Sequence, residues 1–197
     1  IDGCSLVNLF GRIDPSYKLM VNKMLARLWP LEDTFITVIP TGERREAAKA
    51  ESINGVKECL LHVRGGGSLG IFPSGAVSDL SPREHCVRDR EWQEAAIKLI
   101  KKLNVPIVPV RFYDGNSKFY YRLGLISWKV RLLRLPKEIF TKHGKRMRIG
   151  IGPVITPEKQ KEFNDLAEFG NYLRSSVYDM PEPLTYIKRT QLPRTIK

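Results

Sequence analysis

The sequence predicts an α/β fold in a single domain, with a largely parallel central sheet flanked by helices. The chain has 197 residues, 42% of them hydrophobic, which is enough for one domain with a buried core. Short apolar segments alternate along the chain with longer segments of helical composition. The 13 prolines and 15 glycines form no low-complexity block or repeat. We therefore expect one domain at residues 1–180 and a basic C-terminal tail at residues 181–197.

The beginning of the chain alternates between helical and strand-like segments. Residues 4–10 are mostly apolar and predict a short buried helix, and residues 17–21 predict a short strand. A helix is expected over residues 23–29, because Pro30 would end it. The apolar, β-branched segment 35–39 then predicts a buried strand.

The middle of the chain continues this alternation. Residues 43–63 have helical composition, with an expected break at residues 54–55, where Asn is followed by Gly. Residues 68–72 then predict a strand, residues 73–90 a long loop and residues 92–103 a helix.

The remaining elements complete the expected sheet. The segment VPIVPVRF at residues 105–112 predicts a strand whose two prolines favour a strand end or edge, because each removes a ladder donor. Residues 116–140 predict short helices, residues 146–151 a strand and residues 157–178 one or two helices. Ligands bind at the carboxyl ends of parallel strands, so the exits of the strands at 68–72 and 105–112 would share one rim.

Charge and cysteine content narrow the functional classes. Lys and Arg number 33 against 21 Asp and Glu, so the net charge is +12. This surplus favours anionic partners, such as nucleic acid, anionic lipid head groups or phosphate-bearing cofactors, without choosing among them. The cysteines Cys4, Cys59 and Cys86 contain no C-x-x-C pair, so neither a disulfide framework nor a zinc site is expected. No metal site is predicted.

The stretch GIFPSGAVSD at residues 70–79 places Pro73 and Gly75 directly after an expected strand. It is not a Walker loop, because no G-K-[ST] ending follows, and not a dinucleotide fingerprint, because its glycines precede the strand. Glycine after a strand-end proline allows a ligand to approach the backbone, but it serves an ordinary tight turn equally well. Spacing alone leaves both interpretations open.

The segment KFYYRLGLISWKVRLLRL at residues 118–135 combines aromatic residues with five basic residues and no acid. Such a mixture suits the boundary between lipid head groups and acyl chains. It would also suit stacking of single-stranded RNA bases, or core aromatics with a solvated basic face. No RNP, KH or zinc signature in the sequence supports a nucleic-acid-binding module.

These motifs together resemble those of a known family. IFPSGAVS, followed by VPIVPV, resembles the motif pair of PlsC-like lysophospholipid acyltransferases. The stretch from residue 71 to residue 152 resembles the bacterial branch called hemolysin-like or ornithine-lipid-type more closely, through FPSGAVS and FYDGNSKFYYRLGLISWKVRLLRLPKE. Family members also carry an N-H-P-x-G-G-x-D-G motif, and Asp2-Gly3 match its end. The resemblance implies that the catalytic histidine lies upstream of residue 1 and that these 197 residues alone are inactive.

The resemblance implies acyl transfer from acyl-CoA or acyl-carrier protein, as co-substrate, to the hydroxyl of a lyso-lipid in bacterial polar-lipid synthesis, without a bound cofactor. Asp2 would orient the histidine that takes the proton of the attacking hydroxyl. The protein would be peripheral, at the cytoplasmic face of the bacterial inner membrane, with the anionic membrane surface and acyl-carrier protein as partners. The expected substrate-binding residues are Phe72, Pro73, Ser74, Gly75, Ser78, Pro106, Ile107 and Pro109, and the expected membrane contacts are Trp128, Arg131 and Arg134.

One departure from the family pattern bears on the acceptor. Where the general family has Glu-Gly-Thr-Arg, this chain has Ser74-Gly75-Ala76-Val77, so the arginine that would meet an acceptor phosphate is absent. The departure favours an aminoacyl-type lyso-lipid over a phosphate-bearing one. The alternatives are a lipid-binding homologue without activity and the nucleic-acid-binding module.

Overall fold

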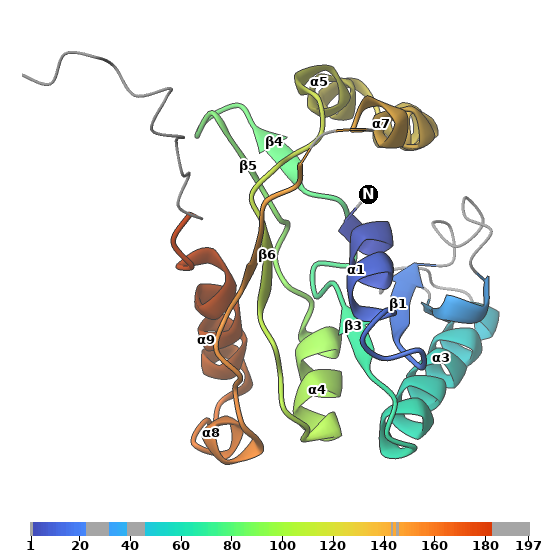
Figure 1. Cartoon of the computed structure of the whole chain (residues 1–197), viewed down its shortest axis with the longest axis vertical. Coiled ribbons are helices and arrows are strands. Elements are labelled where there is room, and N and C mark those ends of the chain that lie inside the picture. Colours follow the sequence, from blue (N-terminus) through green and yellow to red (C-terminus); the bar gives the residue numbers. More distant parts are fainter. Residues whose placement is uncertain (1, 23–31, 39–45, 143, 145, 183–197) are drawn as a thin grey trace, which may run out of the picture.

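The computed structural model describes residues 2–22, 32–38, 46–142, 144 and 146–182 (Figure 1). The strands are β1 (Lys18–Asn22), β2 (Phe35–Val38), β3 (Leu69–Ile71), β4 (Asp79–Ser81), β5 (Cys86–Arg88), β6 (Val110–Phe112) and β7 (Ile149–Ile151). The helices are α1 (Asp2–Phe10), the 3-10 turn η1 (Glu32–Thr34), α3 (Glu46–Arg64), α4 (Glu94–Leu103), α5 (Lys118–Ile126), α6 (Trp128–Leu133), α7 (Leu135–Thr141), α8 (Pro157–Lys161) and α9 (Leu166–Tyr178). The expected helix at 23–29 and the tail beyond residue 182 lie outside the described residues.

A three-stranded parallel sheet in the order β2-β1-β3 forms the first half of the fold. Side chains alternate between its two faces along each strand. Leu19 and Phe35 are buried in one cluster with Leu6 of α1. Ile36 is buried in another cluster with Cys59 of α3. Both faces of this sheet are therefore covered by helices, as the α/β prediction requires.

The prediction of a largely parallel sheet is confirmed only for these three strands. Strand β6 pairs with β7 in antiparallel register, and β4 and β5 form an antiparallel hairpin within the predicted loop at residues 73–90. The strand predicted at 105–112 shortens to β6 and one isolated bridge between Ile107 and Ile155. Pro106 and Pro109 explain this, because neither residue has a backbone N–H to donate to a ladder.

Helix α3 is continuous, so the break predicted at residues 54–55 is wrong. A Cβ on Gly55 would lie 2.3 Å from the Thr37 carbonyl oxygen and 2.9 Å from Val38 Cγ1. Gly55 therefore does not end the helix; it lets the helix lie close against β2. Ile53 is 55% exposed and does not belong to the buried face.

The remaining helices frame the second half of the molecule. Helix α9 packs on α4, where Ile97 and Phe169 share a buried cluster. Helices α5, α6 and α7, which we call the α5–α7 arm, lie beyond the end of α1 that carries the N-terminus (Figure 1). Tyr120 and Leu135 pack the arm against Leu80 of β4. Within the described residues, no helix has the length and apolarity needed to cross a bilayer.

Candidate functional site

The stretch Phe72–Gly75 forms a tight turn at the carboxyl end of β3. The N–H of Gly75 donates to the Phe72 carbonyl at 2.9 Å, and Gly75 has φ of 62°, in the left-handed region that favours glycine. The backbone N–H of Gln93, the N-cap residue of α4, donates to the Pro73 carbonyl at 2.9 Å. The turn is thus attached to the start of α4, which holds it in one conformation.

Ser74 is buried, with 4% of its surface exposed, and its hydroxyl donates to the carbonyl of Ala76 at 3.0 Å. The side-chain amide of Gln93 donates to the Ser74 carbonyl at 3.4 Å. The Ser74 side chain therefore maintains the turn, and its hydroxyl is already engaged with the protein.

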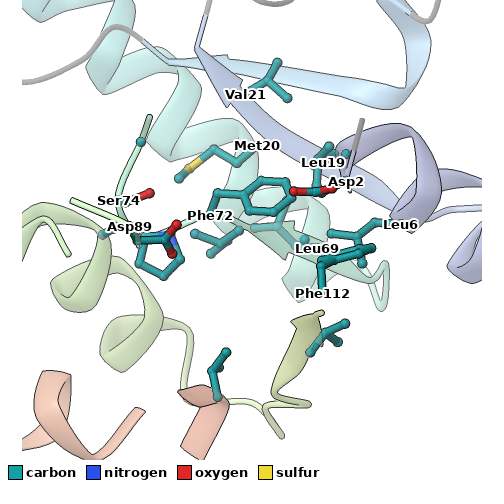
Figure 2. Close-up of a pocket in the computed structure, with 18 of the residues that line it drawn as sticks. Asp2, Leu6, Leu19, Met20, Val21, Leu69, Phe72, Ser74, Asp89 and Phe112 are labelled. Carbon is teal, nitrogen blue, oxygen red and sulfur yellow. The ribbon is translucent and has the colours of Figure 1, made fainter. Parts of the chain in front are cut away.

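A cavity of about 1030 Å³ opens between the parallel sheet and β6. Apolar side chains of β1, β3 and β6 line much of it, including Leu19, Met20 and Phe112 (Figure 2). All eight residues expected from the sequence to bind substrate line this cavity. The turn after β3 and the segment that precedes β6 therefore share one cavity, although β3 and β6 do not share a sheet.

Asp2 lies in the first turn of α1 and lines the same cavity. Burial raises the pKa of its carboxyl above the ordinary value of 3.8; the charge of Lys142 opposes this shift and that of Asp89 adds to it. Figure 2 shows the carboxylates of Asp2 and Asp89 on two sides of the Phe72 ring. Two acids from distant parts of the sequence thus face one space.

Asp89 is a candidate site residue that sequence reasoning missed. Its carboxylate accepts a hydrogen bond of 2.5 Å from the hydroxyl of Ser78, and its backbone N–H donates to the Tyr178 hydroxyl at 3.2 Å. Both Ser78 and Asp89 line the cavity. In the sequence Asp89 stands among several charged residues, and no motif distinguishes it from them.

The three expected membrane contacts have different environments. Trp128 is 45% exposed on the α5–α7 arm. The guanidinium of Arg134 lies over the Phe119 ring, 4.4 Å from its centroid, and is partly exposed. Arg131 is buried, so the prediction that it contacts a membrane is corrected: its guanidinium donates to the Asp79 carboxylate at 2.7 Å instead.

Neither of the described histidines lines the cavity. His62 is half-buried, with Nε2 3.0 Å from the carbonyl oxygen of Ser68, and His85 lies in the turn between β4 and β5. Among the described residues, no group of three His, Cys, Asp or Glu side chains could hold a metal ion. In the described part of the chain, the cavity is thus lined by the carboxylates of Asp2 and Asp89 but by neither histidine.

A family model described as an acyltransferase matches residues 1–185. The chain is also 25% identical, over 186 residues, to a lyso-glycine lipid O-acyltransferase of Bacteroides thetaiotaomicron, covering 91% of this chain and 65% of the relative. A lyso-glycine lipid O-acyltransferase of Phocaeicola vulgatus is 22% identical, with 91% of this chain and 63% of the relative covered. The chain thus spans somewhat less than two thirds of the length of these relatives. Because the family model covers almost the whole chain, the protein belongs to this acyltransferase family.

Proposed function

We propose that the protein transfers a fatty acyl group from acyl-CoA or acyl-carrier protein to the hydroxyl of a lyso-lipid in bacterial polar-lipid synthesis. The observation that carries this proposal is the cavity, in which Asp2, the Phe72–Gly75 turn and Ile107 meet beside a mostly apolar wall. Its volume of about 1030 Å³ and its lining suit a lipid chain better than a small polar substrate.

The proposed reaction is an exchange of a thioester for an oxygen ester. The acceptor hydroxyl attacks the thioester carbonyl, a C–O bond forms, the C–S bond breaks, and the hydroxyl proton passes through a base to the leaving thiolate. The family resemblance assigns that base to a histidine before residue 1. Asp2 would fix the tautomer of this histidine and stabilise its imidazolium form. Because Asp2 is half-buried, water screens its attraction to an adjacent imidazolium less than it would at an exposed site.

The proposed acceptor is a lyso-lipid with an amino-acid head group. Both relatives are named for lyso-glycine lipid, which favours this class over lysophosphatidate. The turn that lines the cavity also continues into Ala76 and Val77, and neither side chain can bind a phosphate. The proposed assignment to the hemolysin-like branch of PlsC-like enzymes rests on the resemblance of FPSGAVS and of FYDGNSKFYYRLGLISWKVRLLRLPKE to that branch.

Membrane docking through the α5–α7 arm is the proposed route to a lipid substrate. Large exposed apolar side chains gather on the arm: Phe119, Leu125, Ile126, Trp128, Val130, Leu133 and Phe140. Glu138 is the one acid among residues 116–142, and it is fully buried against Ser117, whereas six Lys and Arg residues lie in the same range besides the buried Arg131. An apolar surface with cations around it fits an anionic bilayer, as expected at the cytoplasmic face of a bacterial inner membrane.

Flotation with liposomes tests this docking surface. The double variant Ile126→Asp, Leu133→Asp should lose binding to vesicles containing phosphatidylglycerol, since these side chains are 84% and 79% exposed. Val154→Asp is the matched control, because Val154 is 55% exposed and lies outside the arm. Equal binding by the double variant and the control would exclude the arm as the docking surface.

The acyl transfer itself is tested by supplying the full-length protein with an acyl donor and a choice of acceptors. Mass spectrometry should detect a new ester on lyso-glycine lipid, formed faster than on lysophosphatidate. Absence of an ester product on every lyso-lipid, with both acyl-CoA and acyl-carrier protein as donors, would reject the proposal and leave a lipid-binding homologue without activity.

A further inference from the structure

Arg131 lies in α6 and turns away from solvent towards the segment that follows the Phe72–Gly75 turn. Its side chain is 4% exposed. One terminal nitrogen donates to the Asp79 carboxylate at 2.7 Å and to the Ser78 carbonyl at 3.2 Å, and the other donates to the Val77 carbonyl at 3.4 Å. A buried guanidinium needs such partners, because an unpaired charge away from water is strongly unfavourable.

Two of the three residues that Arg131 holds belong to the wall of the cavity. Val77 and Ser78 line the cavity, whereas Arg131 does not. The Ser78 carbonyl accepts from Arg131, and the Ser78 hydroxyl donates to Asp89, whose charge acts on Asp2. Ser78 therefore connects the buried arginine to the two acids that face the cavity.

Gly124 of α5 makes room for this arrangement. A Cβ at this position would lie 2.8 Å from Nη1 of Arg131 and 2.9 Å from its Cδ. Glycine is a poor helix former, so its presence inside α5 is explained by the arginine side chain that crosses the helix there. The Arg131 side chain also lies over the Tyr120 ring, 5.4 Å from its centroid.

We infer that Arg131 is a positioning residue that fixes Ser78 and Asp89 at the end of the cavity where Asp2 lies. This inference rests on the proposed function, in which the partner of Asp2 removes the proton of the acceptor hydroxyl. In that case Ser78 and Asp89, which lie at the same end of the cavity as Asp2, contact the acceptor and not the distant part of the acyl donor. A planar guanidinium reaches three acceptors at once, whereas a lysine presents one nitrogen and cannot hold the same geometry.

The test compares Arg131→Lys with Arg83→Lys in the full-length protein. Arg83 is exposed in the turn between β4 and β5, so its conservative replacement should leave activity unchanged. Arg131→Lys keeps the charge but should lower kcat/KM for lyso-glycine lipid on the order of 10- to 100-fold, because small displacements near reacting groups are costly. The KM for the acyl donor should stay at the wild-type value. Gly124→Ala, which keeps Arg131 but displaces it, should produce the same pattern.

Two further readouts separate positioning from loss of stability. Amide hydrogen exchange at residues 77–81 should accelerate in Arg131→Lys while exchange in α9 does not change. Asp89→Asn should lower kcat/KM by a smaller factor in the Arg131→Lys background than in the wild type, because the effects of substitutions at coupled residues are not additive.

The outcomes separate this inference from the proposed function. If wild-type protein forms no ester, the proposed function fails, and the exchange measurement still reports whether Arg131 holds the segment. If wild-type protein is active and Arg131→Lys behaves like Arg83→Lys, the inference is overturned. Additive effects with Asp89→Asn, or faster exchange in α9 as well, would show general destabilisation and would also overturn it.

Discussion

Replacing Gly75 by alanine changes the turn at the carboxyl end of β3 without adding a charge or a large side chain. At φ of 62°, an L-residue costs about 1–2 kcal/mol, while alanine recovers roughly 0.4–1 kcal/mol by restricting the unfolded chain. The new Cβ would lie 3.2 Å from Nε2 of Gln93, which has to move by a few tenths of an ångström. The net destabilisation is about 1 kcal/mol, small against the roughly 5–15 kcal/mol of a typical domain.

Urea unfolding and acyl transfer, measured on the same preparations, test this estimate. Gly144→Ala is the control, because Gly144 has φ of 74° and is exposed, and no described residue beyond its chain neighbours has a heavy atom within 4 Å of the added Cβ. Both variants should lose about 1 kcal/mol of unfolding free energy, and only Gly75→Ala should transfer acyl groups more slowly. Undiminished transfer by Gly75→Ala, at the expected loss of stability, would refute the view that this turn shapes the substrate site.

Further predictions concern the core and two carboxylates. Phe169→Ala should lose about 3–5 kcal/mol of unfolding free energy in urea, because Phe169 is fully buried between α4 and α9; a loss below 1 kcal/mol would contradict the packing. Hydrogen bonds from Ser16 and Ser68 lower the pKa of Asp14 to about 2. The ionised Asp14 carboxylate therefore stabilises the folded protein fully above pH 3.8, and this stabilisation disappears as the pH falls through 2. Asp14→Asn should therefore be less stable than wild type at pH 5, and the two should converge near pH 2. Burial raises the pKa of Asp2, so the charged form of this carboxyl opposes folding. Asp2→Asn should therefore unfold at a higher urea concentration than wild type at pH 7. This difference in urea concentration should shrink as the pH falls towards 3.8. A constant difference in either pH series would show that the carboxylate does not titrate as described.

The sequence predicted the elements whose signals are local. The apolar β-branched residues of β2 and the FPSG turn after β3 were recognisable, because burial and backbone conformation there depend on neighbouring residues. Gly55 was misinterpreted for the same reason: locally it weakens a helix, and its close approach to Thr37 is a tertiary contact. The antiparallel pairing of β6 with β7 also depends on a partner far along the chain.

The site was predicted where a motif marked it and missed where only tertiary packing does. Asp2 and Ser78 belong to segments that resemble the family, and both line the cavity. Asp89 carries no motif, and only its hydrogen bond with Ser78 distinguishes it. Arg131 was assigned to the membrane from its basic, aromatic surroundings, but residue type does not reveal which arginine on a short helix turns inwards to Asp79.

The rate of ester formation by the full-length protein, with and without the Asp2 carboxylate, tests the central claim most directly. Wild-type protein, given lyso-glycine lipid and an acyl donor, should form the O-acyl product, and Asp2→Asn should form it roughly 10³-fold more slowly or worse. The variant should remain folded, because the substitution removes a buried charge. Equal rates for wild type and Asp2→Asn would contradict the role assigned to Asp2 and to the cavity that it lines.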